Sequence, residues 1–246
     1  MASLFTLVNR TLTSIQNSKT IDDLRNSAIA TIKDLIESID QGKKKIIKHM
    51  IHLVQSGGTV ATYSRSSLVI QGLLDIKKSG IDCNVALCES RPMNEGRRAA
   101  AELTQAGIAV TFWVDAAMSE MVKHCDCVII GADSFSRTDL VNKIGSKALA
   151  LLAQESSTPF YSICTTDKYM PETIVQPHEE DHETSEVWSD PPGLVEVKNI
   201  YFETVPLKWI TQLITERGTF AHKIRSMDWM PQVDSWLNLN LQRLGH

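Results

Sequence analysis

The sequence has no long apolar run, no excess of basic charge and no secretory leader. No apolar stretch reaches the roughly 18 residues needed to cross a bilayer, and residues 1–16 lack a basic start followed by an apolar run. The 25 lysines and arginines stand against 29 aspartates and glutamates, a formal net charge of -4. Proteins that bind nucleic acid along their surface carry a basic excess. We therefore expect a cytoplasmic protein that contacts neither a membrane nor nucleic acid directly.

The cysteines and histidines do not form a pattern that is typical of a disulfide framework or a metal site. The five cysteines are an odd number, and four of them lie in or beside strand-like apolar runs, as reduced core thiols do. Cys125 and Cys127 are one residue apart without a second pair, which is not zinc-site spacing. His178 and His182 are four residues apart, but residues 178–190 hold six acidic residues and no lysine or arginine, as a solvated loop does. We expect no metal and no cofactor.

The first 55 residues have the periodicity of helices. Between Thr20 and Val54 apolar side chains recur every three or four positions, with charged residues in the gaps. Residues 3–16 have a similar pattern. Gly42 is predicted to break the longer run, so residues 1–55 should form a helical region of two or three helices.

After residue 58 the pattern changes to short β-branched runs that alternate with amphipathic segments. This alternation is typical of an α/β domain with a mainly parallel sheet, here residues 56–218. Helices should begin near Arg65, Glu95, Ala116 and Gly145. The tail, residues 219–246, does not continue this alternation of strands and helices. The predicted strands are Thr59–Tyr63, Cys83–Cys88, Ala109–Val114, Cys127–Ile130 and Phe160–Cys164.

Polar residues follow several of these strands, and parallel strands bring such residues to one edge of the sheet, where ligands bind. The first group is in residues 89–98, where a strand end, three arginines and a helix start favour an anion site. Arg91 and Arg97 are its candidates for binding phosphate. The alternative is that Arg97 or Arg98 lies on a solvated helix face.

The second group is in residues 131–146. Asp133, Asn142 and Lys143 bring a carboxylate, an amide and an ammonium into one short stretch. Such a set holds sugar hydroxyls and a phosphate, or transfers a proton. The alternative is a turn capped by Asp133, with Lys143 in solvent.

The third group is in residues 56–67. Ser64, Arg65 and Ser66 lie between a strand and a helix start, where backbone N–H groups can hold a phosphate. The glycines of this segment precede the strand, so it is neither a dinucleotide-binding fingerprint nor a Walker loop. Serines at a helix start are also good caps.

Taken in order along the chain, these segments resemble a known superfamily. TYSRSS, ESRPMNEGRR and GADSF…VNKIG, followed by SEVW…PPG, KNIYFETVP and ITERG, are similar to motifs of the alpha, beta and delta subunits of translation initiation factor 2B. Methylthioribose-1-phosphate and ribose-1,5-bisphosphate isomerases belong to the same superfamily. The resemblance covers roughly residues 20–218. It implies a helical amino-terminal domain on a Rossmann-like α/β domain, assembled as a homodimer or with related subunits.

The resemblance also assigns roles to residues. In the isomerases a cysteine and an aspartate move a proton between adjacent carbons of a sugar phosphate, and these positions fall here on Ser64 and Asp139. The loop that holds Asp139 is about one residue shorter than usual. A cysteine thiol titrates near pH 8.5, whereas a serine hydroxyl needs a dedicated base. Glu95 replaces the family's usual glutamine and adds negative charge beside the phosphate pocket. The amino-terminal loop that binds phosphate in the isomerases is matched here only weakly, at Arg25.

Three functions remain open. The first, favoured by Ser64, is a non-catalytic protein that binds a sugar phosphate or nucleotide as a regulatory ligand. The second is a sugar-phosphate aldose–ketose isomerase that uses Asp139 with a group other than cysteine. The third is an interaction protein with a vestigial pocket, whose tail presents Trp229 and Trp236 to a partner. The alternative for the tail is that both tryptophans cover the sheet edge.

Overall fold

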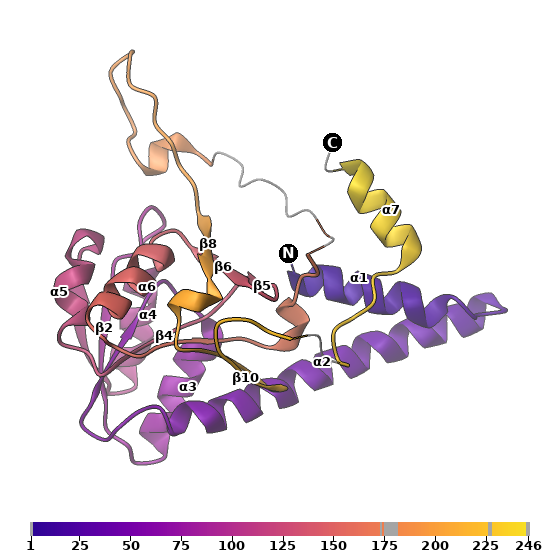
Figure 1. Ribbon diagram of the computed structural model, residues 1–246, viewed down its shortest axis with the longest axis horizontal. Helices are drawn as coiled ribbons and strands as arrows, with labels where there is room; N and C mark the ends of the chain where they lie inside the picture. The colour runs from indigo at the N-terminus through magenta and orange to yellow at the C-terminus, as the bar shows by residue number, and fades with distance from the viewer. Residues whose placement is uncertain (1, 173, 175–181, 226–227, 245–246) are drawn as a thin grey trace.

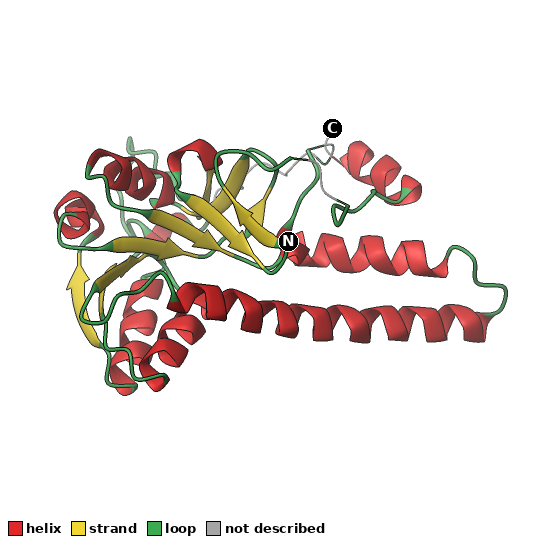
Figure 2. Ribbon diagram, turned by 60° about the horizontal axis from the view of Figure 1, so that its bottom comes forward, coloured by secondary structure: helices red, strands yellow, loops and turns green. Residues whose placement is uncertain are grey.

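The computed structural model describes residues 2–172, 174, 182–225 and 228–244 (Figure 1). It opens with an antiparallel pair of helices, α1 (Ala2–Ile15) and α2 (Ile21–Ile51), which lie side by side (Figure 2). Thr20 caps α2 by accepting a hydrogen bond from the Asp23 N–H at 3.1 Å. No helix in these described ranges has the length and apolar character needed to cross a membrane.

The predicted break at Gly42 is wrong, because α2 runs unbroken through this residue. Gly42 is buried where α2 contacts residues that follow the carboxyl ends of β7 (Phe160–Ile163) and β9 (Gln212–Thr215). A β-carbon at this position would lie 3.1 Å from Glu216 Cγ and 3.3 Å from Thr165 Cγ2. A glycine inside a helix costs only about 1 kcal/mol relative to alanine. The long amphipathic run on both sides therefore keeps the helix intact, and the missing side chain allows the close contact.

The core of the molecule is a seven-stranded sheet with the order β10-β9-β7-β4-β1-β2-β3. All neighbours pair in parallel except β10, which forms an antiparallel hairpin with β9. The mainly parallel sheet is confirmed, and the five predicted strands match to within one residue at each end. The strands are β1 (Thr59–Thr62), β2 (Asn84–Cys88), β3 (Ala109–Trp113), β4 (Cys127–Ile130), β7 (Phe160–Ile163), β9 (Gln212–Thr215) and β10 (Gly218–Phe220).

Helices cover both faces of this sheet. α2, α3 (Ser67–Lys78) and α4 (Glu95–Gln105) pack on one face, and α5 (Met118–Val122) and α6 (Ser146–Glu155) lie on the other. The short 3₁₀ helix η1 (Asp115–Ala117) leads into α5. Side chains of β4 alternate between the two cores, with Val128 in one and Ile129 in the other. The helices predicted near Arg65, Glu95, Ala116 and Gly145 are all present.

A second, three-stranded sheet was not predicted. It has the order β5-β6-β8 and is antiparallel throughout, with β5 (Ser134–Phe135), β6 (Asp139–Lys143) and β8 (Phe202–Pro206). The segment 134–139, interpreted from the sequence as a short polar loop, instead forms β5 and the turn into β6. The pairing of β6 with β8 depends on residues about 60 positions away, which local pattern does not show. The pairing sets Lys143 opposite Phe202.

The carboxyl-terminal tail folds back over the molecule. Trp229 packs on the rings of Phe135, Tyr169 and Phe220, with centroids 5.7–6.5 Å apart. Phe220 belongs to the edge strand β10, so the alternative that the tryptophans cover the sheet edge holds for Trp229 but not for Trp236. Trp236, on α7 (Ser235–Leu244), is 62% exposed. The boundary predicted at residue 218 falls inside the β9–β10 hairpin. The other boundaries remain predictions.

Candidate functional site

A cavity of about 340 Å³ opens at the carboxyl ends of β1, β4 and β7. β1 pairs with β2 on one side and with β4 on the other. The direction in which successive strands are added to the sheet therefore reverses at β1, which makes it the topological switch point. Ligands of open α/β sheets bind at this point. The cavity brings together six of the residues predicted from the sequence: Ser64, Arg65, Ser66, Asp133, Asn142 and Lys143.

Two predicted residues do not line the cavity. Asp139, predicted as the catalytic aspartate, begins β6 opposite Pro206, and its carboxylate accepts a hydrogen bond from Thr138 Oγ1 at 2.5 Å. Arg25 is exposed near the amino terminus of α2. The carboxylates that the structure places in the cavity are those of Asp133 and Glu95.

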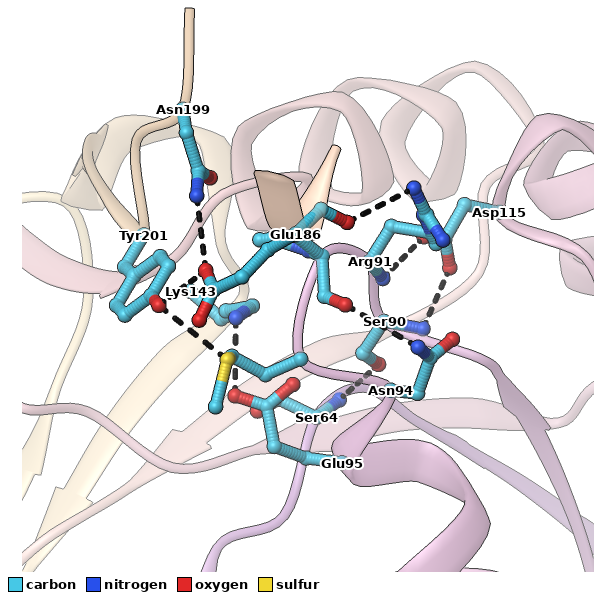
Figure 3. A network of polar contacts seen from close by, with 12 residues as sticks. Ser64, Ser90, Arg91, Asn94, Glu95, Asp115, Lys143, Glu186, Asn199 and Tyr201 are labelled. Carbon is cyan, nitrogen blue, oxygen red and sulfur yellow. Dashed lines mark hydrogen bonds and ion pairs between the residues drawn. The ribbon is translucent and has the colours of Figure 1, made fainter. Parts of the chain in front are cut away.

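Two further predicted residues, the arginines of the segment after β2, also lie outside the cavity. The guanidinium of Arg91 donates to the backbone carbonyls of Glu186 and Val187, each at 3.2 Å (Figure 3). Arg97 is exposed on α4, as is Arg98, in keeping with the solvated-face alternative. The segment contributes Glu95 to the cavity instead.

Lys143 is buried at the wall of the cavity with a carboxylate partner. Its ammonium lies 2.9 Å from Glu95 Oε1 and 4.8 Å from the centre of the Tyr201 ring, and its side chain is 3% exposed (Figure 3). Such a partner offsets part of the cost of burying the ammonium group. The other oxygen, Glu95 Oε2, is buried with no hydrogen-bond partner among the described residues. Glu95 was not predicted as a site residue. The sequence feature that could have identified it is the glutamate in place of the family's usual glutamine.

A polar network ties the segment before β8 to the rim of the cavity. The Tyr201 hydroxyl donates to Glu186, whose carboxylate also accepts from Asn199 Nδ2 at 2.8 Å (Figure 3). The hydrogen bond to Glu186 raises the pKa of Tyr201 to about 12. The hydrogen bond from Tyr201, followed by that from Asn199, lowers the pKa of Glu186. With Arg91 bound to the same segment, Tyr201 is held over Lys143.

Ser64 has a left-handed backbone conformation, with φ of 59°. Its N–H donates to Ser90 Oγ at 2.8 Å, and Asp115 accepts from the N–H groups of Ser90 and Arg91 at 2.8 and 2.7 Å. Non-glycine residues with such angles cost about 1–3 kcal/mol and concentrate at functional sites. No base in the described part of the chain accepts a hydrogen bond from the Ser64 hydroxyl.

Four groups among the described residues of the cavity have shifted pKa values: burial raises the pKa of Tyr63, Asp133 and Cys164, and the hydrogen bond to Glu102 raises that of Arg65. Burial raises the pKa of Asp133, and the ammonium groups of Lys168 and Lys143 partly offset this effect. Burial also raises the pKa of Cys164, which therefore stays a thiol at neutral pH. Asp133 therefore holds its proton more tightly than an exposed aspartate does.

The described ranges contain no group of three or more residues suited to a metal ion. Of the histidine pair, His178 lies outside the described residues, and the ring of His182 stacks on Tyr201 with centroids 3.6 Å apart. All five cysteines are free.

The sequence profile of the Initiation factor 2 subunit family matches residues 1–222. The chain belongs to this family. Similar members include a ribose 1,5-bisphosphate isomerase of Methanocaldococcus jannaschii, 33% identical over 199 residues, which cover 79% of this chain and 65% of that protein. A putative translation initiation factor eIF-2B subunit 2-like protein of Pyrococcus furiosus is 31% identical, covering 89% of this chain and 75% of that one.

The fold of the family is confirmed by a solved structure. The translation initiation factor eIF-2B of Pyrococcus horikoshii OT3 superposes with a TM-score of 0.73 at 29% identity, covering 90% of this chain and 76% of that one. The chain spans about two thirds of the length of the isomerase it matches. Family members thus carry both isomerase and initiation-factor names, and the residues of the pocket must decide between them.

Proposed function

We propose that this family member binds a phosphorylated sugar or nucleotide in the pocket as a regulatory ligand and does not convert it. The observation that carries the proposal is Ser64 at the position that the resemblance assigns to the isomerases' cysteine, without a base to take its proton. A hydroxyl with no base exchanges protons far more slowly than a thiol at neutral pH.

The pocket also has the size and groups that a small phosphorylated ligand needs. Its volume of about 340 Å³ is within the range of small-molecule sites. Lys43, Arg65 and Lys168 supply positive charge, and the amino-terminal end of α3, which Ser66 caps, lines the same cavity. We propose that the protein acts as a homodimer or beside related subunits, in keeping with the initiation-factor names in the family.

Thermal-shift titration with ribose 1,5-bisphosphate, methylthioribose 1-phosphate and nucleoside monophosphates, followed by NMR of the sugar protons in D₂O, tests the proposal. A ligand present at 100 times its Kd stabilises the native state by about 2.7 kcal/mol, so binding raises the melting temperature. We expect binding without exchange of the sugar carbon-bound protons. Exchange catalysed by the unaltered protein would contradict it.

Asp133 favours one second candidate, an aldose–ketose isomerase. Its raised pKa and its place in the cavity suit a group that shuttles a proton, whereas Asp139 lies outside the cavity. In that case Asp133→Asn removes turnover and Asp139→Asn retains it. Ser64→Cys measures how much activity the thiol alone restores, and Ser67→Cys, three positions further on at the start of α3, is the control.

A further inference from the structure

The charges that line the pocket are paired unequally. Of the described residues that line it, four are cationic, and three of these have a carboxylate nearby: Lys143 has Glu95 at 2.9 Å, Arg65 has Glu102 at 2.6 Å and Lys43 has Asp40 at 3.4 Å. The fourth is Lys168. Its ammonium donates to the Ala132 carbonyl at 2.5 Å and has no carboxylate within 4.0 Å among the described residues. Lys168 is therefore the pocket cation best able to take an anionic group.

Lys143 cannot easily be redirected to a ligand. Its side chain is 3% exposed, it is paired with Glu95, and the Tyr201 ring lies over it. The segment of Tyr201 is itself held by Asn199 and Arg91. A phosphate that approached Lys143 would also meet the carboxylate of Glu95.

Glu95 brings a negative charge to the wall of the pocket. One of its oxygens is used by Lys143, and the other, Oε2, is buried without a hydrogen-bond partner among the described residues. A sugar hydroxyl can donate to a carboxylate at the wall of a pocket, because a hydroxyl has a proton as well as lone pairs. A phosphate dianion has acceptor oxygens only and is repelled.

From this arrangement we propose that the pocket selects a ligand with a single phosphate and excludes bisphosphates. The phosphate binds at Lys168 and the amino terminus of α3, and an unphosphorylated hydroxyl binds at Glu95. This inference rests on the proposed function and specifies its ligand class. A single phosphate carries a charge of about −1.5 to −2 at neutral pH, and a bisphosphate carries about twice that. The second phosphate of a bisphosphate has no unpaired cation to meet.

Calorimetric titration of the unaltered protein with ribose 1-phosphate, ribose 5-phosphate and ribose 1,5-bisphosphate tests this selection directly. We expect at least one monophosphate to bind ten times or more tightly than the bisphosphate. Equal or tighter binding of the bisphosphate would overturn the inference while leaving the proposed function in place. If none of these ribose phosphates, and none of the nucleotides of the earlier titration, binds, both are overturned.

Glu95→Gln tests the cause. The amide removes the negative charge and offers a hydrogen-bond donor, so the affinity for the bisphosphate should rise about tenfold. The ratio of monophosphate affinity to bisphosphate affinity should therefore fall. Glu120→Gln, on the surface of α5, is the control and should leave both affinities unchanged. If Glu95→Gln does not fold, the double variant Glu95→Gln, Lys143→Gln removes both charges of the pair. An unchanged preference in a folded variant would contradict the role of Glu95.

Discussion

Glu95 and Lys143 set the charge at the wall of the pocket. They lie 48 positions apart, on α4 and at the end of β6. Lys143 is almost fully buried, whereas the Glu95 side chain is 26% exposed. Removing one partner of a buried pair leaves the other charge uncompensated, which destabilises a protein more than removing both.

A double-mutant cycle measures this coupling. Glu95→Gln and Lys143→Met should each lower the free energy of unfolding, and the double variant should lose less than their sum. The expected coupling is about 1–3 kcal/mol, from urea unfolding. The exposed pair of Glu120 and Lys123 serves as the control and should give no measurable coupling. Additive single changes at positions 95 and 143 would show that the pair contributes nothing.

Asp133 gives a prediction on pH. Because burial raises its pKa in the folded state, the folded protein binds the proton more tightly than the unfolded chain, and ionisation opposes folding. Asp133→Asn should therefore raise the melting temperature at pH 7. The gain should disappear as the pH falls towards about 3.9, the pKa of an ordinary aspartate. Asp190→Asn, on an exposed loop, should show no such trend.

At the scale of elements, α2 shows how a contact overrides a local signal. A glycine in an amphipathic run predicts a break in the helix, yet α2 continues through Gly42 because the residues on both sides favour helix. The missing side chain leaves room for Glu216 and Thr165, which contact the helix at this position. The strands were predicted well for the opposite reason: runs such as Cys127–Ile130 are buried on both faces and apolar throughout. The β5-β6-β8 sheet was missed because β5 has only 2 residues, and because β6 and β8 are partly polar and pair with each other across about 60 positions.

Gly42→Leu tests the contact of α2 with the sheet edge. The added side chain would meet Glu216 and Thr165, so we expect the free energy of unfolding to fall by about 1–3 kcal/mol in urea titration. Lys44→Leu, at an exposed position of the same turn, should change it by less than about 0.5 kcal/mol. Equal effects of the two substitutions would show that the position tolerates a side chain.

On the scale of the whole molecule, the two ends of the chain are joined. The buried side chain of Asn9 on α1 donates to the Gln232 carbonyl at 3.0 Å and accepts from the Asp234 N–H at 2.7 Å. Phe5 and Leu237 share a small apolar cluster beside them. The tail therefore holds α1 in place, and α1 in turn packs on η2 (Thr166–Lys168), the segment that carries Lys168 to the pocket.

Asn9→Ala should loosen this junction without unfolding the sheet. The change leaves the buried Asp234 N–H unpaired, a cost of about 1–3 kcal/mol. We expect faster hydrogen exchange in α1 and in residues 232–238, with unchanged protection in β1 and β4. Asn17→Ala, at an exposed position after α1, is the control. Protection lost across the whole chain would contradict a local role.

The sequence by itself determined where five of the parallel strands lie along the chain, the polar groups at their carboxyl ends, and the hydroxyl in place of a thiol at Ser64. These depend on residue identity and on the local period of apolar side chains. Only the tertiary structure decided that Lys143 is paired with Glu95, that Arg91 binds backbone carbonyls 95 and 96 positions away, and that Asp133 rather than Asp139 faces the cavity. The reason is that strand pairing and burial bring distant groups together, and these contacts fix which charges are left for a ligand.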